Sequence, residues 1–151
     1  MINLAENHGM NLSFDRIYAE GIDQVLPFIQ QLSNNTFTDE VLKTRFLEML
    51  EQPYECHGVY DGQELIGVFG LWFLTKHYAG KMCEPDHIII KDAYRSKGVG
   101  KSLFDWIADY AKEKGCKAAE LNSYVSNYPS HKFYMNNGYH IIGYHFIQFF
   151  K

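Results

Sequence analysis

The sequence predicts an α/β (α+β) fold with a largely antiparallel sheet. Three observations support this: strand and helix patterns are mixed along the chain, Asp61-Gly62 is a signal for a hairpin with a type I′ turn, and an amphipathic helix pattern at 98–114 follows an apolar strand. The 151 residues are 46% hydrophobic and 21% charged, which is ordinary globular composition. One domain is expected at 12–151, after a tail at 1–11 without an apolar leader.

The N-terminal half is expected to contain strands and two helices. A first strand covers 12–19, and a helix follows at 23–33, with Asp23 as its cap. Thr38 or Asp39 caps the second helix, which ends before Pro53. Further strands are expected at 54–60, 64–74 and 82–90.

Three residues predict irregular places in the sheet. Gly67 and Gly70 lie within the strand at 64–74 and indicate close packing or a bulge. Pro85 lies within the strand at 82–90, where its missing N–H also favours a bulge. The sheet is therefore expected to bend near these positions.

The C-terminal half begins with the strongest helix pattern. Its apolar stripe covers 98–114, and Gly115 ends it as a C′ glycine. A strand is expected at 118–125, and a short helix opens at Pro129 and closes at Gly138. One or two final strands are expected at 139–150, broken near Gly143.

Composition excludes several classes of protein. The 14 basic and 18 acidic residues give a net charge of −4, whereas a nucleic-acid binder normally has a basic surface. No apolar run approaches the ~20 residues that span a bilayer. Cys56, Cys83 and Cys116 form no CxxC pair, which favours buried thiols in the cytoplasm over disulfides. The seven histidines lack ligand spacing, so no metal site is expected.

The turn at 95–101 has the residues of a phosphate-binding site. In order they are Arg95, Ser96, Lys97, Gly98, Val99, Gly100 and Lys101. The turn opens a helix, where free N–H groups and the macrodipole favour anions, and its glycines admit a ligand close to the backbone. A tight strand-to-helix turn with solvated lysines fits the same residues. The Walker and GxGxxG spacings do not match, which disfavours a nucleotide site of those kinds.

Later motifs complete a family pattern. The RxxGxG turn at 95–100 is followed by Asn127 and by Phe-Tyr-x-x-x-Gly-Tyr at 133–139. Together they resemble the GCN5-related N-acetyltransferase (GNAT) superfamily over about residues 12–150. The resemblance implies a mixed, mostly antiparallel sheet of six to seven strands flanked by about four helices. It also implies that the chain transfers an acetyl group to an amine.

The resemblance implies a binding site for acetyl-CoA. The cofactor would lie in a V-shaped gap between the fourth and fifth strands, here 82–90 and 118–125. Main-chain atoms of Ile88 and Ile90 would pair with its pantetheine arm, and the Ile88 N–H would polarise the thioester carbonyl. The complete set of implied cofactor residues is Ile88, Ile90, Arg95, Ser96, Lys97, Gly98, Val99, Gly100, Lys101 and Asn127.

The resemblance also implies acid–base catalysis. Tyr134 matches the tyrosine that protonates the departing CoA thiolate, although a core aromatic fits the same position. A primary amine is mostly protonated at neutral pH, so a base is needed. Glu84 is the first choice of base and Asp86 the alternate, although exposed acids at a strand end fit them too. Strand alternation predicts that both acids share one face with Ile88 and Ile90.

The acceptor pocket would be rich in aromatic residues. It would be formed by 34–46, 72–78 and 139–149, whose aromatic side chains suit an amine or a peptide lysine. The run at 130–146 is also similar to bacterial small-molecule members, including aminoalkylphosphonate acetyltransferases. His87 lies beside the two acids and is a further possible base. The small-molecule and protein acceptors both remain open.

Two further expectations concern assembly and activity. Family members are often dimers, and the aromatic last strand could pair across a two-fold axis as a homodimer. A non-catalytic CoA-binding sensor of the same fold is the alternative to an enzyme. Tyr134 and Glu84 favour the enzyme because a sensor needs neither.

Overall fold

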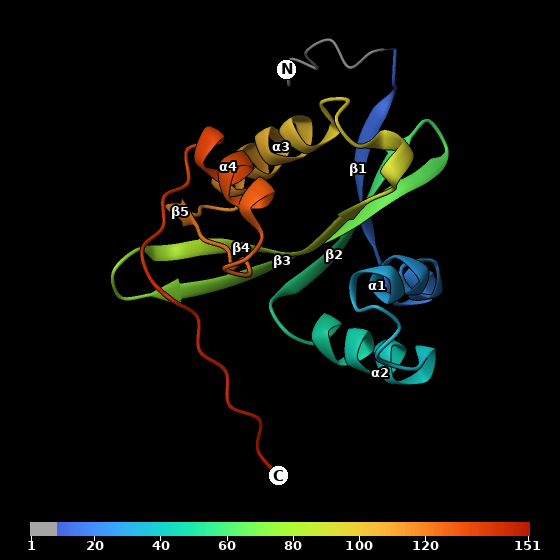
Figure 1. Ribbon diagram of the computed structural model, residues 1–151, viewed down its shortest axis with the longest axis horizontal. Coiled ribbons are helices and arrows are strands. Elements are labelled where there is room, and N and C mark those ends of the chain that lie inside the picture. Colours follow the sequence, from blue (N-terminus) through green and yellow to red (C-terminus); the bar gives the residue numbers. More distant parts are fainter. Residues whose placement is uncertain (1–8) are drawn as a thin grey trace.

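The computed structural model describes residues 9–151 and contains a five-stranded mixed sheet (Figure 1). Its strands are β1 Leu12–Ile17, β2 Tyr54–Asp61, β3 Glu64–Lys76, β4 Gly80–Ile90 and β5 Ala118–Ala119. β1 to β4 form an antiparallel meander in chain order, and β5 pairs with β4 in parallel. The predicted class, a mixed and mostly antiparallel sheet, is confirmed. Most of the expected tail at 1–11 lies outside the described residues.

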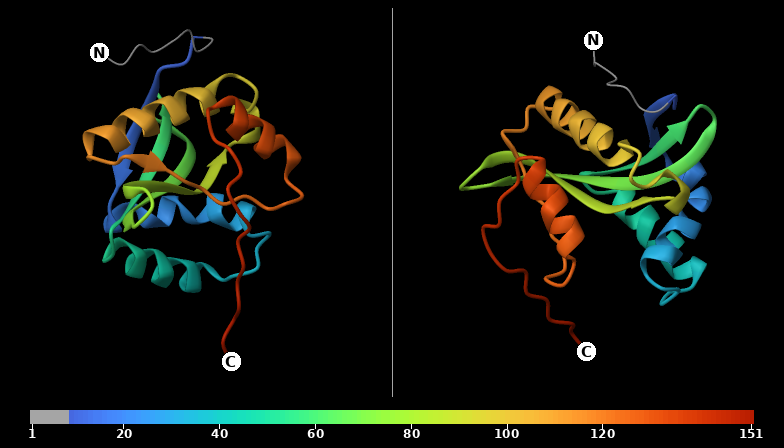
Figure 2. Two further views of the ribbon diagram at one scale, coloured as in Figure 1. Left: turned by 90° about the vertical axis from the view of Figure 1, so that its left-hand side faces the viewer. Right: turned by 45° about the horizontal axis from the view of Figure 1, so that its top comes forward.

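Helices cover both faces of the sheet (Figures 1 and 2). They are α1 Leu26–Leu32, α2 Asp39–Leu50, α3 Val99–Glu113 and α4 Tyr128–Asn136, with short 3-10 turns at Ala19–Gln24 and Asp92–Tyr94. α1 and α2 lie on one face and α3 on the other, and α4 packs against α3 through Phe104. The four α-helices agree with the predicted number.

Local chemistry accounts for where the first two helices begin. Thr38 accepts a hydrogen bond from Val41 N at 3.3 Å and is the N-cap of α2, as expected. The expected helix at 23–33 is divided instead. Val25 N bonds to Ile22 O at 2.9 Å, which closes a 3-10 turn, and α1 begins after it with a proline in its first turn.

The sheet separates two apolar layers. Buried residues on the α3 face include Phe69, Leu71, Cys83, Leu103 and Ile107. Buried residues on the α1 and α2 face include Ile22, Phe46, Tyr54, Val68 and Ile89. β4 contributes Cys83 to the first layer and Ile89 to the second, so its side chains reach both faces of the sheet.

β4 contains the bulge that Pro85 and Gly70 predicted. Val68 pairs with Ile89 and Gly70 with Asp86, so two residues of β4 lie opposite one of β3. The first of them, His87, has a φ of 37°, an uncommon value for a non-glycine residue. A Cβ on Gly70 would lie 2.2 Å from His87 Nε2, so this glycine makes room for the bulge.

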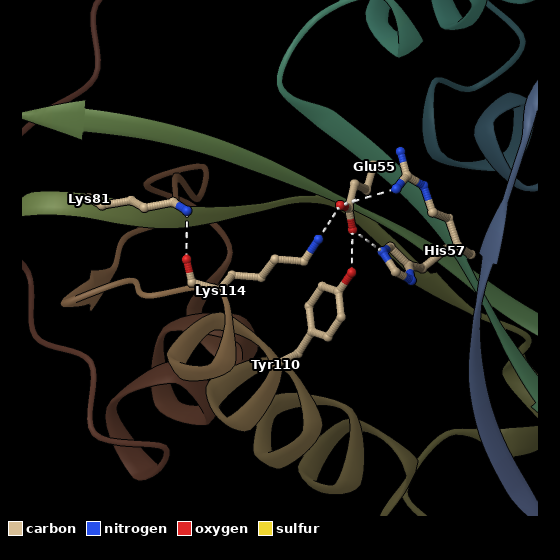
Figure 3. Close-up of polar contacts among 6 residues, drawn as sticks. Glu55, His57, Lys81, Tyr110 and Lys114 are labelled. Carbon is tan, nitrogen blue, oxygen red and sulfur yellow. Dashed lines mark hydrogen bonds and ion pairs between the residues drawn. The ribbon is translucent and has the colours of Figure 1, made fainter.

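A buried carboxylate joins the end of α3 to β2 (Figure 3). Glu55 accepts hydrogen bonds from Tyr110 at 2.7 Å, His57 Nε2 at 3.0 Å and Lys114 Nζ at 3.0 Å, and it pairs with Arg16 at 3.3 Å. Burial opposes its charge, but the bonds from His57, Tyr110 and Lys114 lower the pKa of Glu55 to about 2. The cluster anchors the helix to the sheet.

Expectations about the C-terminal third are wrong in two places. The strand expected at 118–125 is only Ala118–Ala119, and 139–151 forms no strand, so the sheet has five strands instead of six or seven. Side chains at 140–151 are exposed. Strand propensity stabilises a sheet through cross-strand neighbours, and these side chains lack such packing.

The β2–β3 hairpin forms at the expected place but with another turn type. Asp61 pairs with Glu64, which leaves Gly62 and Gln63 as the central residues. A type I′ turn needs positive φ at both, whereas only Gly62 has it, at 59°. The turn type depends on Gln63, which the Asp-Gly signal does not include.

Candidate active site

The turn after β4 presents backbone N–H groups at the start of α3. Gly98 caps this helix with a φ of 82°, and the first helical bond runs from Ser102 N to Gly98 O at 3.1 Å. The N–H groups of Val99, Gly100 and Lys101 precede that bond and have no acceptor within the helix. Because α3 has 15 residues, its dipole adds positive potential at this end. The turn therefore fits an anionic phosphate group.

The three cations of the turn differ in their contacts. Arg95 pairs with Asp92 at 2.9 Å and donates from Nε to Ile90 O at 3.3 Å. Lys101 pairs with Asp105 one helical turn on. Lys97 Nζ lies 5.8 Å from the centroid of the Tyr94 ring. Arg95 and Lys101 are thus each paired with a carboxylate, whereas Lys97 contacts an aromatic ring.

Gly100 has a packing role that the sequence did not indicate. A Cβ at this position would lie 3.3 Å from the Phe133 ring of α4. The missing side chain therefore allows α4 to approach the first turn of α3, in addition to giving a ligand access to the backbone.

β4 and β5 pair over a short length. Met82 pairs with Ala118 and Cys83 with Ala119, and the last bond runs from Glu120 N to Cys83 O at 3.0 Å. β4 continues to Ile90, so its edge beyond Cys83 does not form a regular ladder with β5. This is the position at which a gap between the two strands was expected.

Glu84 lies where the two strands separate. Asn122 Nδ2 donates to its Oε1 at 3.0 Å, and Trp72 is its cross-strand partner on β3. Burial raises the pKa of Glu84, and the negative charges of Glu120 and Asp86 raise it further, while Lys76 and the Asn122 bond oppose them. A carboxylate with a raised pKa can accept a proton near neutral pH.

Asp86 is engaged by its neighbours. Its Oδ2 accepts from Trp72 Nε1 at 3.0 Å, and its Oδ1 accepts from the backbone N of His87 at 2.8 Å. Both contacts support the bulge. Of the two acids, Glu84 is therefore the one with fewer direct donors.

The bulge also corrects the predicted faces of β4. Trp72 packs on the α1 and α2 side, so its partner Glu84 faces that side, whereas Ile88 and Ile90 pack on the α3 side. The two acids and the two isoleucines therefore do not share a face. The extra residue reverses strand alternation, which simple counting along the strand could not include.

His87 is a structural part of the bulge. Its Nε2 lies 2.5 Å from the Tyr54 hydroxyl, and its ring packs edge-on against Phe46. Burial lowers the pKa of His87, so the ring stays neutral near pH 7. Its position between Tyr54 and Phe46 favours support of the strand over proton transfer.

Tyr134 lies on the opposite side of the sheet from Glu84. It belongs to α4, and its ring centroid is 5.7 Å from Phe104 of α3 and 6.2 Å from Tyr139. Burial raises the pKa of Tyr134, and a side-chain bond with Ser130 opposes that rise. The phenol therefore keeps its proton at physiological pH.

Asn127 caps α4. Its Oδ1 accepts from Ser130 N at 3.4 Å, and it precedes a proline in the first turn. The side chain orders the helix that contains Tyr134, so the position has a structural use besides its expected contact with the cofactor.

Sequence reasoning missed Asn122 and Glu120, and it placed Trp72 only in the acceptor wall. All three act through pairings between strands. Trp72 reaches the acids because it is opposite Glu84, and Asn122 does so because β5 runs beside β4. No local motif signals such neighbours; only the strand register could have found them.

Comparison with known proteins identifies the class. The sequence model of the Acetyltransferase (GNAT) family matches residues 22–139, and the chain belongs to this family. A protein named for ribosomal protein bS18-alanine N-acetyltransferase activity from Bacillus subtilis (strain 168) is 30% identical over 121 residues, 79% of this chain and 74% of the relative. Aminoalkylphosphonate N-acetyltransferase of Salmonella typhimurium is 23% identical over 122 residues, 80% of this chain and 79% of the relative.

Solved structures agree on the fold. The structure of AAC(6')-Iy in complex with the bisubstrate analogue CoA-S-monomethyl-acetylneamine superimposes with a TM-score of 0.79 at 14% identity. The match covers 93% of this chain and 99% of that chain.

In the part of the chain that the structure describes, no helix is long and apolar enough to cross a membrane. Residues 9–151 also bring together no group of three potential metal ligands.

Proposed function

We propose that the chain is an acetyl-CoA-dependent N-acetyltransferase that acetylates a primary amine by direct attack in a ternary complex. The observation that supports this most is the position of Glu84 and Tyr134. They lie on opposite faces of the sheet: Glu84 directly follows Cys83, the last residue of β4 that pairs with β5, and Tyr134 packs on the α3 side against Phe104. A proton acceptor on one side and a proton donor on the other suit transfer between two substrates that meet there.

The residues at the start of α3 would hold the cofactor. When bound, acetyl-CoA supplies an acetyl group activated as a thioester. The N–H groups of Val99, Gly100 and Lys101 would bind its pyrophosphate, with Lys97 as the least engaged of the three side-chain cations. The backbone of Ile88 and Ile90 would bind the pantetheine arm, and Ser96, Gly98 and Asn127 would shape the site around it.

Two side chains would move the protons. Glu84 would accept the proton that a primary ammonium must lose before attack. Its raised pKa makes the carboxylate a stronger base for this proton. Tyr134 would hold its proton for the departing thiolate, as burial favours. Asp86 would orient the strand through Trp72 and His87, and it is the alternate base.

The acceptor would be a cationic amine. Glu84, Asp86 and Glu120 are electrostatic neighbours beside Trp72, and such a surface attracts a protonated amine. The two relatives are named for acetylating an alanine of ribosomal protein bS18 and an aminoalkylphosphonate. Both acceptors contain an amine, which supports the reaction type and leaves open whether the acceptor here is a small molecule or a protein.

Other properties complete the proposal. Residues 12–151 would form one acetyltransferase domain. Cys56, Cys83 and Cys116 are free and buried, which supports work in a reducing compartment such as the cytoplasm.

Thiol release tests the proposal. The purified chain is mixed with acetyl-CoA and a panel of diamines, aminoglycosides, aminophosphonates and peptides, and free CoA thiol is followed. Saturable turnover on at least one amine is expected. Acetyl-CoA binding without turnover on any acceptor would instead favour the sensor module.

A substitution in the turn tests the cofactor site. Gly98→Val places a branched side chain at a positive φ, and we expect it to weaken acetyl-CoA binding by about 100-fold or more through strain and obstruction of the turn. Calorimetric titration measures this. Unchanged affinity would mean that the phosphate site lies elsewhere.

A further inference from the structure

His87 holds a backbone conformation that residues other than glycine rarely adopt. Its φ of 37° is positive, and it is the only non-glycine residue in the described strands with a positive φ. A strained conformation of this kind persists only where the surrounding structure holds it in place, and such residues are concentrated at functional sites. The neighbours that hold His87 are therefore candidates for a role in the reaction.

Tyr54 is the neighbour that holds the His87 ring through a hydrogen bond. It belongs to β2, which lies two strands away from β4, yet its hydroxyl reaches to 2.5 Å from His87 Nε2. Burial raises the pKa of Tyr54, so the hydroxyl keeps its proton and can donate it to the lone pair of the neutral ring. The other ring nitrogen, Nδ1, is buried and has no hydrogen-bond partner among residues 9–151. Within these residues the ring depends on Tyr54 for its polar attachment.

The strand between the two residues leaves room for this bond. Gly70 of β3 pairs with Cys56 of β2 and with Asp86 of β4. A Cβ on Gly70 would lie 2.2 Å from His87 Nε2 and 2.8 Å from the Tyr54 hydroxyl oxygen. The Tyr54 side chain therefore crosses β3 at Gly70, and the missing side chain there makes space for the bond as well as for the bulge.

Aromatic rings from α2 and β3 pack around both partners. Phe46 of α2 packs edge-on against Tyr54 and His87, with centroids 6.4 Å and 5.3 Å from its own. The Trp72 ring of β3 lies 4.7 Å from the Tyr54 ring, and its Nε1 donates to Asp86. These contacts hold the tyrosine ring with or without its hydroxyl. A phenylalanine at this position would therefore keep the packing and lose the bond.

Tyr54 acts through His87 and not on a substrate. Only 1% of the residue is exposed, because Phe46 and Trp72 cover its ring. A reacting amine or thioester does not reach a hydroxyl that is covered in this way. This separates its role from the proton transfers that are proposed for other side chains.

We propose that Tyr54 is a positioning residue for acetyl transfer, because its hydroxyl holds His87 in the conformation that forms the bulge. The bulge places Glu84 on one face of β4 and Ile88 on the other. Without the extra residue, strand alternation would return both to one face. The base and the backbone that binds the cofactor would then no longer meet their two substrates from opposite sides. This role rests on the proposed function, whereas the effect of the hydroxyl on the bulge does not.

Removing the hydroxyl tests the role. We expect Tyr54→Phe to lower kcat per folded enzyme by about 10-fold and to change KM for acetyl-CoA by less than about 3-fold, because the turn before α3 is untouched. Tyr60→Phe changes a half-buried tyrosine of the same strand and should keep full kcat. Steady-state kinetics and circular dichroism measure turnover and the folded fraction. A normal kcat in Tyr54→Phe would overturn the proposal.

A rescue variant separates positioning from a contribution to stability alone. Glycine adopts a positive φ readily, so His87→Gly should form the bulge without the hydroxyl. When His87→Gly is already present, we expect Tyr54→Phe to lower kcat by less than about 2-fold, against about 10-fold in the wild type. An equal or larger loss of kcat in the glycine background would contradict the role.

Amide NOEs between β3 and β4 test the bulge without measuring acetylation. The wild type should show contacts of Val68 with Ile89 and of Gly70 with Asp86, as the register requires. Tyr54→Phe should weaken these contacts or add a second set, because the strand would also adopt regular alternation. An unchanged pattern would overturn the proposal, whether or not the double variant folds. A changed pattern in a chain that acetylates no amine would confirm the effect of the hydroxyl on the bulge and overturn the proposed function.

Discussion

Two glutamates on the same sheet illustrate how surroundings assign opposite roles to one residue type. Glu55 on β2 is surrounded by donors and cations, and its pKa falls to about 2. Glu84 on β4 has one direct donor, Asn122, and two acidic neighbours, and its pKa is raised by burial and by those charges. The surroundings of the first carboxylate favour its charged form, while those of the second favour its protonated form.

The number and sign of the partners make the difference. Glu55 receives Tyr110, His57, Lys114 and Arg16, so its charge is fully used in tying α3 to β2. A carboxylate so strongly stabilised would be a poor base. Glu84 has fewer hydrogen-bond partners: Asn122 donates to its Oε1, so its Oε2 can face a substrate. The comparison therefore separates a structural acid from the acid that we propose as the base.

The largest effect on turnover should follow from removing the proposed base, Glu84. Glu84→Gln keeps the shape and loses the base, so we expect kcat to fall by about 10²–10³-fold, or roughly 3–4 kcal/mol of barrier, with little change in stability. Steady-state kinetics and thermal unfolding measure the two. Glu64→Gln, an exposed acid on β3, is the matched control and should keep full turnover. Normal turnover in Glu84→Gln would exclude it as the base.

Replacing the structural acid, Glu55, should have the reverse effect: stability falls and turnover is kept. Glu55→Gln leaves Arg16 and Lys114 facing an uncharged group, and we expect the free energy of unfolding to drop by about 2–3 kcal/mol at pH 7, with kcat of the folded fraction nearly unchanged. The folded pKa of Glu55 lies below its unfolded value. Its contribution is therefore present above about pH 4.5 and is lost as the pH falls toward 2.

Denaturant titrations at several pH values check this prediction. The stability difference between the wild type and Glu55→Gln should be largest near neutral pH and should shrink as the pH falls. A difference independent of pH would mean that packing, and not the charge, accounts for the effect.

A smaller effect is expected at the proposed acid. Tyr134→Phe removes the proton held by the buried phenol, so we expect kcat to fall about 10-fold or more while acetyl-CoA affinity stays the same. Tyr128→Phe changes an exposed tyrosine on the same helix and serves as the control. A drop in affinity without a drop in kcat would assign Tyr134 to cofactor binding instead.

The smallest effect is expected from removing the hydrogen bond between Asn122 and Glu84. The Asn122 bond lowers the pKa of this acid, so Asn122→Ala should raise it. The base works only when deprotonated, so activity is lost as the pH falls through that pKa. The acidic limb of the profile of kcat/KM against pH should therefore move to higher pH. An acidic limb that stays in place would separate Asn122 from the base.

Much of the fold was predictable because its signals are local. Thr38 caps α2, Gly115 has the positive φ of a C′ glycine, and α4 begins with a proline in its first turn, as their types require. The bulge in β4 was also expected, from Pro85 and Gly70. Each of these features depends on a few consecutive residues or on a glycine that a neighbour approaches.

The candidate site was predictable only in part. The turn at 95–101 could be predicted because a glycine cap and a helix start are adjacent in the chain. The direction in which each side chain of β4 points could not, since one extra residue at His87 reverses the alternation beyond it. The short β5 and the unpaired segment at 139–151 also escaped prediction, because strand propensity does not specify a partner.

The sequence by itself determined the family, the glycine turn before α3 and the presence of Glu84 and Tyr134, since each motif behind them is a short run of residues that can be recognised without knowing what it contacts. Only the tertiary structure decided which acid is fully partnered, which faces of β4 the acids and isoleucines occupy, and how Trp72 and Asn122 reach the site. Those outcomes depend on strand register and on contacts between distant segments. The electric field at a carboxylate is the sum over such neighbours, so the roles of Glu55 and Glu84 became distinct only in the folded chain.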